Sequence, residues 1–291
     1  MNAMSEMRTI VMRAGNTWTD TGIPRVAMVN AEACSSQVYQ PMLHLVLQGS
    51  KTLSVGEQML SYPSGSYFIV PVDLPATGEV YPAGPDAPYL AVCLSLDPGI
   101  IASLLGSIDE PHSQDAPPRF SSATASPEII DAWTRMMRLA DRPSEVGLLA
   151  PMVEREIIFR ALQGPLAGML REIALPDTRI ARIRSVTHWI REHFAEPFRI
   201  ESLAGMAGMS VAVFYRHFRA VTAMTPVQYQ KRLRLLRARW ALFFESGEAA
   251  TVAFAVGYES ASQFSREYAR MFGMPPSRDM ARFRTGGAGT D

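Results

Sequence analysis

Cysteine is scarce in this chain of 291 residues, which has only Cys34 and Cys93. Two cysteines cannot form the disulfide framework that stabilises many small secreted domains, so the sequence favours a reducing compartment. Long apolar runs are absent too, because no stretch approaches the ~20 residues that a membrane-spanning helix needs. The opening segment MNAMSEMRTI has an arginine but no apolar core behind it, unlike a secretory signal. We therefore expect a cytoplasmic protein that does not enter a membrane.

Motifs typical of catalysis and metal binding are missing as well. A common divalent-metal centre of small β-barrels uses a His-x-His pair with a glutamate and a later histidine, since imidazole and carboxylate together hold the ion. The chain has five histidines without any His-x-His pair, and only His44 lies in a predicted strand. No Gly-x-Ser-x-Gly segment or P-loop occurs. The sequence thus predicts no metal, no cofactor and no enzymatic activity.

Charge is balanced overall but unevenly distributed. Residues 1–177 carry 11 Lys+Arg against 19 Asp+Glu, a net charge of −8, whereas residues 178–285 carry 17 against 8, a net charge of +9. A strongly basic third in a neutral protein indicates a local surface that binds a polyanion. The alternative is that the basic segment docks on the acidic one.

Short β-prone runs separated by turn residues occupy the first part of the chain. Residues 43–60, LHLVLQGSKTLSVGEQML, have turn signals at hairpin-like spacing, and further short strands are predicted at 67–70 and 88–96. Such a pattern predicts a small barrel or sandwich, which we place at residues 1–126.

The apolar period becomes helical after these strands. Asp97 and Pro98 fit the N-cap and first position of a helix. Residues 108–126 are polar and proline-rich, which predicts an exposed loop. Residues 127–177 then carry two amphipathic helical stripes that predict a helical linker and a candidate dimer contact. Polarity and charge change at 175–177, so the expected fold class is α+β, with an all-α domain at 178–285.

One sequence segment occurs twice, in similar form, in the basic third. FYRHFRAVTAMTP at 214–226 and FSREYARMFGMPP at 264–276 align at an offset of 50 residues. In both copies an arginine lies between apolar residues spaced i and i+4, and a helix stop follows. The repeat therefore predicts one helix used twice, with a buried face and an outward cation.

The segment before each repeated helix fits a helix-turn-helix, in which two helices pack through a small residue beside a tight turn. In the first copy the close-packing residue, turn glycine, N-cap and buried anchor are Ala204, Gly208, Ser210 and Phe214. In the second copy they are Ala253, Gly257, Ser260 and Phe264. The glycine-to-phenylalanine spacing is six in the first copy and seven in the second, so the turns differ by one residue. We place the motifs at about 201–219 and 250–270.

The segments ESLAGMAGMSVAVFYRHFRAVTAMTPVQYQKRLRLLRAR and VAFAVGYESASQFSREYARMFGMPPSR resemble the two helix-turn-helix motifs of the AraC/XylS transcription regulators. The resemblance implies a seven-helix domain whose motifs enter successive major grooves of double-stranded operator DNA, joined by a long helix near 226–244. For such a regulator, RNA polymerase is a further candidate partner.

Family position implies which residues of each recognition helix face DNA. These are Ser210, Ala212, Tyr215, Arg216 and Arg219 on the first, and Ala261, Ser262, Arg266 and Arg270 on the second. Arginine can pair with both acceptors of a guanine edge, whereas alanine can at most contact a thymine methyl. Two alternatives remain, phosphate contact and neutralisation of a neighbour such as Glu267. The cations of the linking helix, Lys231, Arg232, Arg234, Arg237 and Arg239, are either phosphate contacts or a solvated face.

The N-terminal part resembles the cupin-like barrel arm of one subgroup of these regulators. The segments HLVLQGSKTL, REIIFRALQGPLAGMLREIA and TPVQYQKRLRL carry this resemblance. That resemblance implies a small-molecule effector in the barrel and a homodimer. Candidate effector contacts are Tyr39, His44, Tyr67, Phe68, Tyr81, Tyr89 and Cys93. Two other functions stay open, a cupin-type enzyme with a DNA-binding tail and a sensor of oxidants or electrophiles that uses Cys93 or Cys34.

Overall fold

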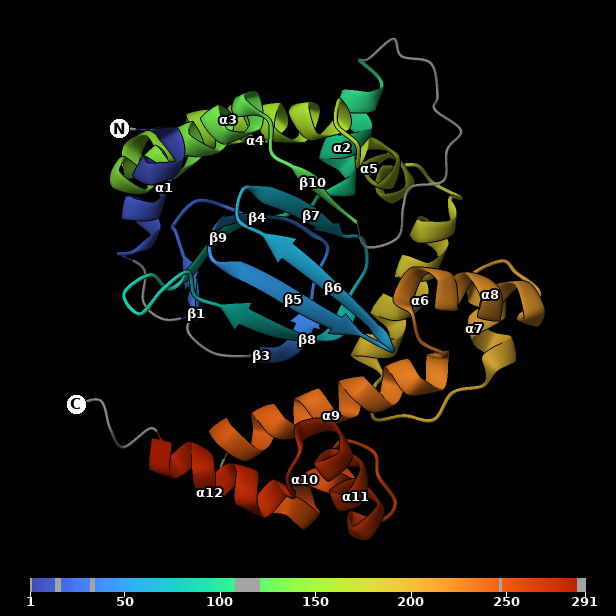
Figure 1. The fold of residues 1–291 in the computed structure, drawn as a ribbon. Coiled ribbons are helices and arrows are strands. Elements are labelled where there is room, and N and C mark those ends of the chain that lie inside the picture. Colours follow the sequence, from blue (N-terminus) through green and yellow to red (C-terminus); the bar gives the residue numbers. More distant parts are fainter. Residues whose placement is uncertain (1, 14–16, 32–34, 108–120, 246–247, 287–291) are drawn as a thin grey trace. The chain divides into compact units, whose positions relative to one another are not determined.

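The computed structural model describes residues 2–13, 17–31, 35–107, 121–245 and 248–286. The chain divides into two compact units, Met1–Arg184 and Ser185–Asp291 (Figure 1). This division falls inside a helix, a few residues after the domain boundary that we predict at 177/178.

Unit 1 is built on two antiparallel sheets. The larger sheet has the order β1 (Thr17–Asp20), β2 (Val26–Ala31), β9 (Tyr89–Ser95), β4 (Met42–Gln48), β7 (Ser66–Val70) and β10 (Ser122–Thr124). The smaller sheet has the order β3 (Ser35–Tyr39), β8 (Leu74–Tyr81), β5 (Ser50–Val55) and β6 (Gln58–Pro63). The predicted strands are confirmed, but the strands form two separate sheets and not a closed barrel.

Helices cover the larger sheet of unit 1 on the face away from the smaller one (Figure 1). They are α1 (Ala3–Val11), α2 (Pro98–Leu105), α3 (Pro127–Arg138), the short 3₁₀ helix η1 (Leu139–Asp141), α4 (Pro143–Leu162) and α5 (Ala167–Ala174). The predicted cap of α2 is confirmed, since the Asp97 side chain accepts a hydrogen bond of 2.7 Å from the Gly99 N–H. Of the loop predicted at 108–126, residues 108–120 lie outside the described residues, and Ser122–Thr124 is a strand that pairs with β7.

All regular secondary structure in the described part of unit 2 is helical. Seven helices follow in order: α6 (Arg179–Glu192), which begins in unit 1, α7 (Ile200–Met206), α8 (Val211–Thr222), α9 (Pro226–Phe244), α10 (Ala249–Ala255), α11 (Ala261–Phe272) and α12 (Pro276–Gly286). The helix α9 has 19 residues and is therefore roughly 29 Å long. It begins with a complete capping box formed by Thr225 and Gln228. The expected α+β class and the all-α second part are confirmed.

Candidate nucleic-acid interface and ligand site

The two repeated segments fold into two helix-turn-helix units, α7–α8 and α10–α11. The close-packing alanines Ala204 and Ala253 are buried, as are the anchors Phe214 and Phe264. The turn glycines, Gly208 and Gly257, both have positive φ, 63° and 87°. Only glycine adopts this conformation at no steric cost, so both turns have the residue they need.

The turns of the two motifs start alike and end differently. In the first, the Met209 N–H donates to the Ala204 carbonyl at 2.9 Å, and in the second, the Tyr258 N–H donates to the Ala253 carbonyl at 3.0 Å. The second turn then has one additional residue, Glu259, before the N-cap of α11. The predicted one-residue difference is confirmed, and it leaves the following helix unchanged.

The helix α8 has a buried face and an exposed face. Phe214 and Phe218 are fully buried. The five residues assigned to DNA, Ser210, Ala212, Tyr215, Arg216 and Arg219, are all exposed. Within the described part of the chain, the guanidinium groups of Arg216 and Arg219 have no ion-pair or hydrogen-bond partner, so both are available to an external ligand.

The helix α11 repeats this arrangement. Ser262, Arg266 and Arg270 are exposed and Ala261 is half-buried, while Phe264 and Tyr268 are buried. The alternative that Arg266 neutralises Glu267 does not hold. Glu267 instead accepts hydrogen bonds from Lys231 Nζ at 2.8 Å and from Tyr258 Oη at 2.9 Å, and its pKa is lowered because these bonds and that of Gln263 outweigh its partial burial. Arg266 and Arg270 have no protein partner among the described residues.

The cations of the linking helix α9 have structural contacts, and only Arg237 of the five is exposed, so a solvated face does not describe the other four. Arg234 donates to the carbonyls of Phe194 at 2.7 Å, Gly257 at 2.7 Å and Ala195 at 3.1 Å. Lys231 pairs with Glu267, and Arg239 pairs with Asp279, whose carboxylate is buried. Arg237 lies over the rings of Phe194 and Trp240. Arg232 is half-buried and has contacts within the protein. The helix α9 therefore uses these side chains to hold neighbouring segments.

In unit 1, five of the seven predicted effector residues gather between the two sheets. These are Tyr39, His44, Phe68, Tyr89 and Cys93, all buried. His44 is the centre of the group, because its Nε2 lies 2.7 Å from Tyr89 Oη, its Nδ1 lies 2.9 Å from Cys93 Sγ, and its ring stacks on Phe68.

The other two predicted effector residues lie elsewhere. Tyr67 is next to Phe68 in β7 and so points to the opposite face of the larger sheet. A Cβ on Gly164, between α4 and α5, would lie 2.6 Å from Tyr67 Oη, which places this ring among the helices. Tyr81 is exposed and donates to Glu79. Neither faces the space between the sheets.

Burial sets the protonation states of the interior groups. It lowers the pKa of His44 well below its ordinary value, an effect to which the charge of Lys51 adds, and it raises the pKa of Tyr89 and of Cys93. Cys93 is therefore a thiol and not the reactive thiolate that a sensor needs. Cys34, the other sensor candidate, lies outside the described residues.

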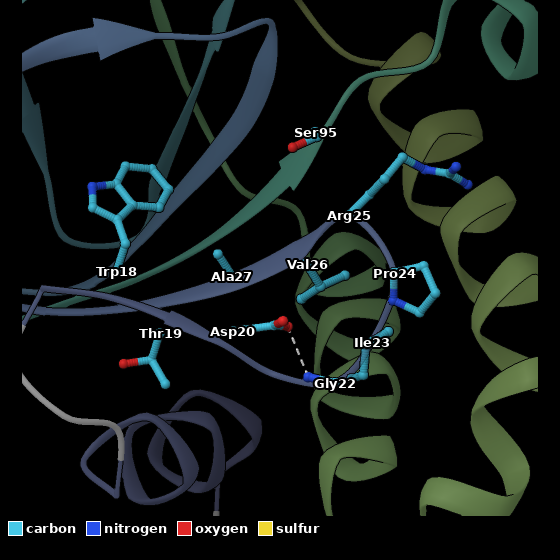
Figure 2. A pocket seen from close by; sticks show the side chains of 10 residues that line it. All are labelled: Trp18, Thr19, Asp20, Gly22, Ile23, Pro24, Arg25, Val26, Ala27 and Ser95. Atoms are coloured by element: carbon cyan, nitrogen blue, oxygen red, sulfur yellow. Dashed lines mark hydrogen bonds between the residues drawn. The ribbon is translucent and has the colours of Figure 1, made fainter.

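An open pocket of about 460 Å³ lies at one end of the larger sheet (Figure 2). Trp18 and Asp20 of β1, the turn that leads to Arg25, and Ser95 at the end of β9 are among its lining residues. Figure 2 shows the Arg25 side chain pointing to the helices, where its Nε donates to Glu154 of α4 at 2.9 Å. None of these residues was predicted. The available signal was Trp18 followed by the turn-prone segment Gly22-Ile23-Pro24.

The described part of the chain contains no group of three or more His, Cys, Asp or Glu side chains that could hold a metal ion. None of its helices has the length and apolar character to cross a membrane.

A family model described as the N-terminus of AraC-type transcriptional regulators matches residues 22–169, just over half of the chain. The chain belongs to the AraC-type transcriptional regulators. A second model, a helix-turn-helix domain, matches residues 203–282 and so covers both motifs of this AraC-type chain. The family predicted from the repeated phrase is thereby confirmed.

Curated relatives of this AraC-type chain include the HTH-type transcriptional activator RhaS of two organisms. The protein from Escherichia fergusonii is 30% identical over 130 residues, which are 44% of this chain and 46% of the relative. The protein from Escherichia coli O1:K1 / APEC is 27% identical over 161 residues, 54% of this chain and 56% of the relative. The chain spans about half the length of the curated relatives that it matches.

Solved structures of ToxT from Vibrio cholerae share the fold of this AraC-type chain. Wild-type ToxT of strain SCE256 with a bound unsaturated fatty acid has a TM-score of 0.56 and 10% identity, covering 92% of this chain and 97% of the other. ToxT of strain O395 bound to (E)-4-(8-methylnaphthalen-1-yl)but-3-enoic acid has a TM-score of 0.57 and 10% identity, covering 87% and 100%. At this identity the likeness shows the fold alone.

Proposed function

We propose that this AraC-type protein is a sequence-specific transcriptional regulator that binds double-stranded operator DNA through α8 and α11. One observation carries the proposal. Two helix-turn-helix units built in the same way each present two arginines that have no partner among the described residues. Arg216 of α8 and Arg266 of α11 are at equivalent positions. Arg219 and Arg270 each lie one turn further along the same helix. Lys231, Arg234 and Arg239 of the same unit are engaged in internal contacts. The arginines of α8 and α11 are exposed and remain available to a polyanion.

The roles within each recognition helix follow from side-chain chemistry. Arg216 and Arg266 are proposed to read base edges, where a bidentate pair with guanine gives about 1–3 kcal/mol of discrimination. Arg219 and Arg270, in the last turns of the helices, are proposed to contact phosphates or bases further along. The remaining proposed DNA contacts are Ser210, Ala212, Tyr215, Ala261 and Ser262.

Binding to the protein's own upstream intergenic DNA, compared with unrelated DNA at several salt concentrations, tests the proposal. We expect a clear preference for the upstream fragment and a steep salt dependence. Arg216→Ala and Arg266→Ala should each reduce this preference. Arg278→Ala, which removes an exposed arginine of α12, is the charge-matched control and should keep it. Unchanged operator affinity in both recognition-helix variants would contradict the assignment.

We further propose that a small molecule bound in unit 1 controls DNA binding by changing the populations of the regulator's states. The interior of unit 1 supports this, since it holds polar groups that its own fold leaves unpaired. A homodimer is proposed as the active form, supported by the exposed Leu148 and Met152, one turn apart on α4. RNA polymerase is the proposed partner in transcription. Catalysis is not part of the proposal, because the buried Cys93 and His44 are held as a thiol and a neutral ring.

Sedimentation of the full-length protein with and without operator DNA measures the oligomeric state. Leu148→Glu combined with Met152→Glu should shift the protein toward the monomer, and Met59→Glu, at an exposed methionine of β6, is the control.

A further inference from the structure

A lysine is buried between the two sheets of unit 1. Lys51 belongs to β5, in which Lys51, Leu53 and Val55 alternate with more polar residues and share the inner face. Its exposed fraction is 3%. Lys51 and Lys231 are the only lysines of the chain, whose other basic side chains are arginines and five histidines.

The Lys51 ammonium has no anionic partner. It lies 4.8 Å from the ring centre of Tyr39 and 5.8 Å from that of Tyr89, and it makes no ion pair or hydrogen bond with any residue that the structure describes. Tyr39 Oη is also buried and without a hydrogen-bond partner. Buried charges and hydroxyls are normally paired, because water no longer compensates them. A fully buried hydroxyl without a partner, beside an ammonium that faces only rings, therefore indicates that an anionic partner is supplied from outside the chain.

The sheet makes room for this pair of groups. Gly78, on the neighbouring strand β8, lies beside both, since a Cβ there would overlap Tyr39 Oη and lie 3.1 Å from Lys51 Cε. The backbone of Gly78 is not in the left-handed region, so glycine is needed here for space and not for conformation. Tyr39 Oη and Lys51 Cε thus occupy the space that a side chain at position 78 would need, and the absence of that side chain lets the two groups lie side by side.

We propose that Lys51 and Tyr39, over Gly78, bind the carboxylate of a small organic acid that acts as the regulator's ligand. The charge of the site favours a monoanion. Lys51 supplies one positive charge, and the nearby His44 and Cys93 are neutral, so a phosphate dianion would leave charge uncompensated. The Tyr39 hydroxyl donates to the second carboxylate oxygen. This inference rests on the proposed control of DNA binding by a ligand of unit 1, and it names the chemistry of that ligand.

Aromatic rings connect this site with the pocket of Figure 2. Tyr89, whose ring faces the ammonium, is hydrogen-bonded to His44, and the His44 ring lies 6.2 Å from that of Trp18 in an edge-on arrangement. Trp18 is one of the residues that line the pocket. The body of the acid is accordingly expected to be apolar or aromatic, because rings form the surroundings of the site.

The two-lysine composition provides a direct test. Full-length protein labelled with ¹³C at the lysine ε position gives two side-chain signals, and Lys231→Arg identifies the one from Lys51. The probes are phenylacetate and hexanoate, each titrated beside its uncharged amide. We expect at least one carboxylate to shift the Lys51 signal saturably, with its amide inactive. Equal responses to acid and amide, or no response to either acid up to its solubility limit, would overturn the inference.

Two variants separate a ligand site from a structural role. Gly78→Ala should abolish the Lys51 response to the acid, while Gly84→Ala, where a Cβ meets nothing closer than 3.9 Å, should retain it. Lys51→Met should raise the melting temperature of the free protein, since it removes an unpaired buried charge. A lysine kept for its contacts with the two rings would instead give a lower melting temperature. These readouts contain no DNA, so a failure of operator binding is distinguishable from a failure of this site.

Discussion

At the scale of single residues, Arg234 decides how unit 2 is held together. Its guanidinium donates to backbone carbonyls of the α6–α7 connection and of the second turn, at Gly257. Arg234→Met leaves these partly buried carbonyls without donors, so we expect a loss of about 2–3 kcal/mol in the free energy of unfolding. Denaturant unfolding of the full-length protein, followed by the fluorescence of Trp189 and Trp240 in unit 2, measures it.

Arg237→Met is the matched control for Arg234, because it removes the same group from the same helix. Arg237 is exposed and contacts only ring faces, so its loss should cost less than about 1 kcal/mol. Similar losses in both variants would contradict the structural role of Arg234.

The sequence showed these cations but could not separate their roles. Lys231, Arg234 and Arg266 all belong to the basic third, and composition treats them alike. What distinguishes them is whether a carbonyl or carboxylate lies within reach, which depends on packing between distant segments. Gly257 illustrates the same limit. Its turn was predictable from spacing, yet it is also required because a Cβ would overlap the Ala195 carbonyl, which lies far away in sequence.

At the scale of elements, the two recognition helices end in the same backbone conformation but with different residues. Both helices end in a left-handed residue, Ala223 with φ 57° after α8 and Gly273 with φ 78° after α11. In this conformation the Cβ of an L-residue lies too close to the backbone, which costs roughly 1 kcal/mol. We therefore expect Ala223→Gly to stabilise unit 2 by about 1 kcal/mol. Thermal or denaturant unfolding of the full-length protein gives the difference.

Gly273→Ala is the reciprocal change and should destabilise unit 2 by a similar amount. No atom lies within 4 Å of the position that its Cβ would take, so its effect reports the backbone conformation alone. If both substitutions changed stability in the same direction, the left-handed C-caps would not be the cause.

The helices and the strands differ in how well the sequence predicts which side chains face inward. The repeated phrase predicted α8 and α11, their buried anchors and their outward arginines, because helical periodicity separates the two faces. In the strands, prediction was weaker. All five residues of β7 are buried, so composition could not tell that Phe68 faces the smaller sheet and Tyr67 the helices. Pairing register decides this. The alternation of β5 does place Lys51 with Leu53 and Val55 on one face, and this was the signal for an inward lysine.

At the scale of the whole molecule, the two units should respond differently to acid, because unit 1 contains a buried neutral histidine. Burial lowers the pKa of His44 in the folded state, with an added effect from Lys51. In the unfolded chain the pKa returns to about 6.5. Below that pH the unfolded chain binds a proton that the folded unit does not, so stability falls as pH falls.

The stabilising effect of the neutral His44 is thus complete above about pH 6.5 and decreases by up to ~1.4 kcal/mol per pH unit below it. Other acid-sensitive groups affect stability only at lower pH. Glu6 and Glu156 have lowered pKa values because of their bonds to Arg138 and Arg135, and their contributions are lost only as carboxylates protonate. Between about pH 5 and pH 6.5, the loss of stability should therefore come from His44.

Urea unfolding over this range, in a protein whose Trp189 and Trp240 are replaced by Phe, reports unit 1 through Trp18 and Trp133. We expect the free energy of unfolding to fall with pH in this background and to stay nearly level in His44→Gln. His188→Gln, which changes an exposed histidine of unit 2, should leave the slope of unit 1 intact. An equal slope in His44→Gln would show that the buried ring does not govern the acid response. Loss of the slope in His44→Gln would show that a single neutral imidazole, held between Tyr89 and Cys93, couples the stability of unit 1 to pH.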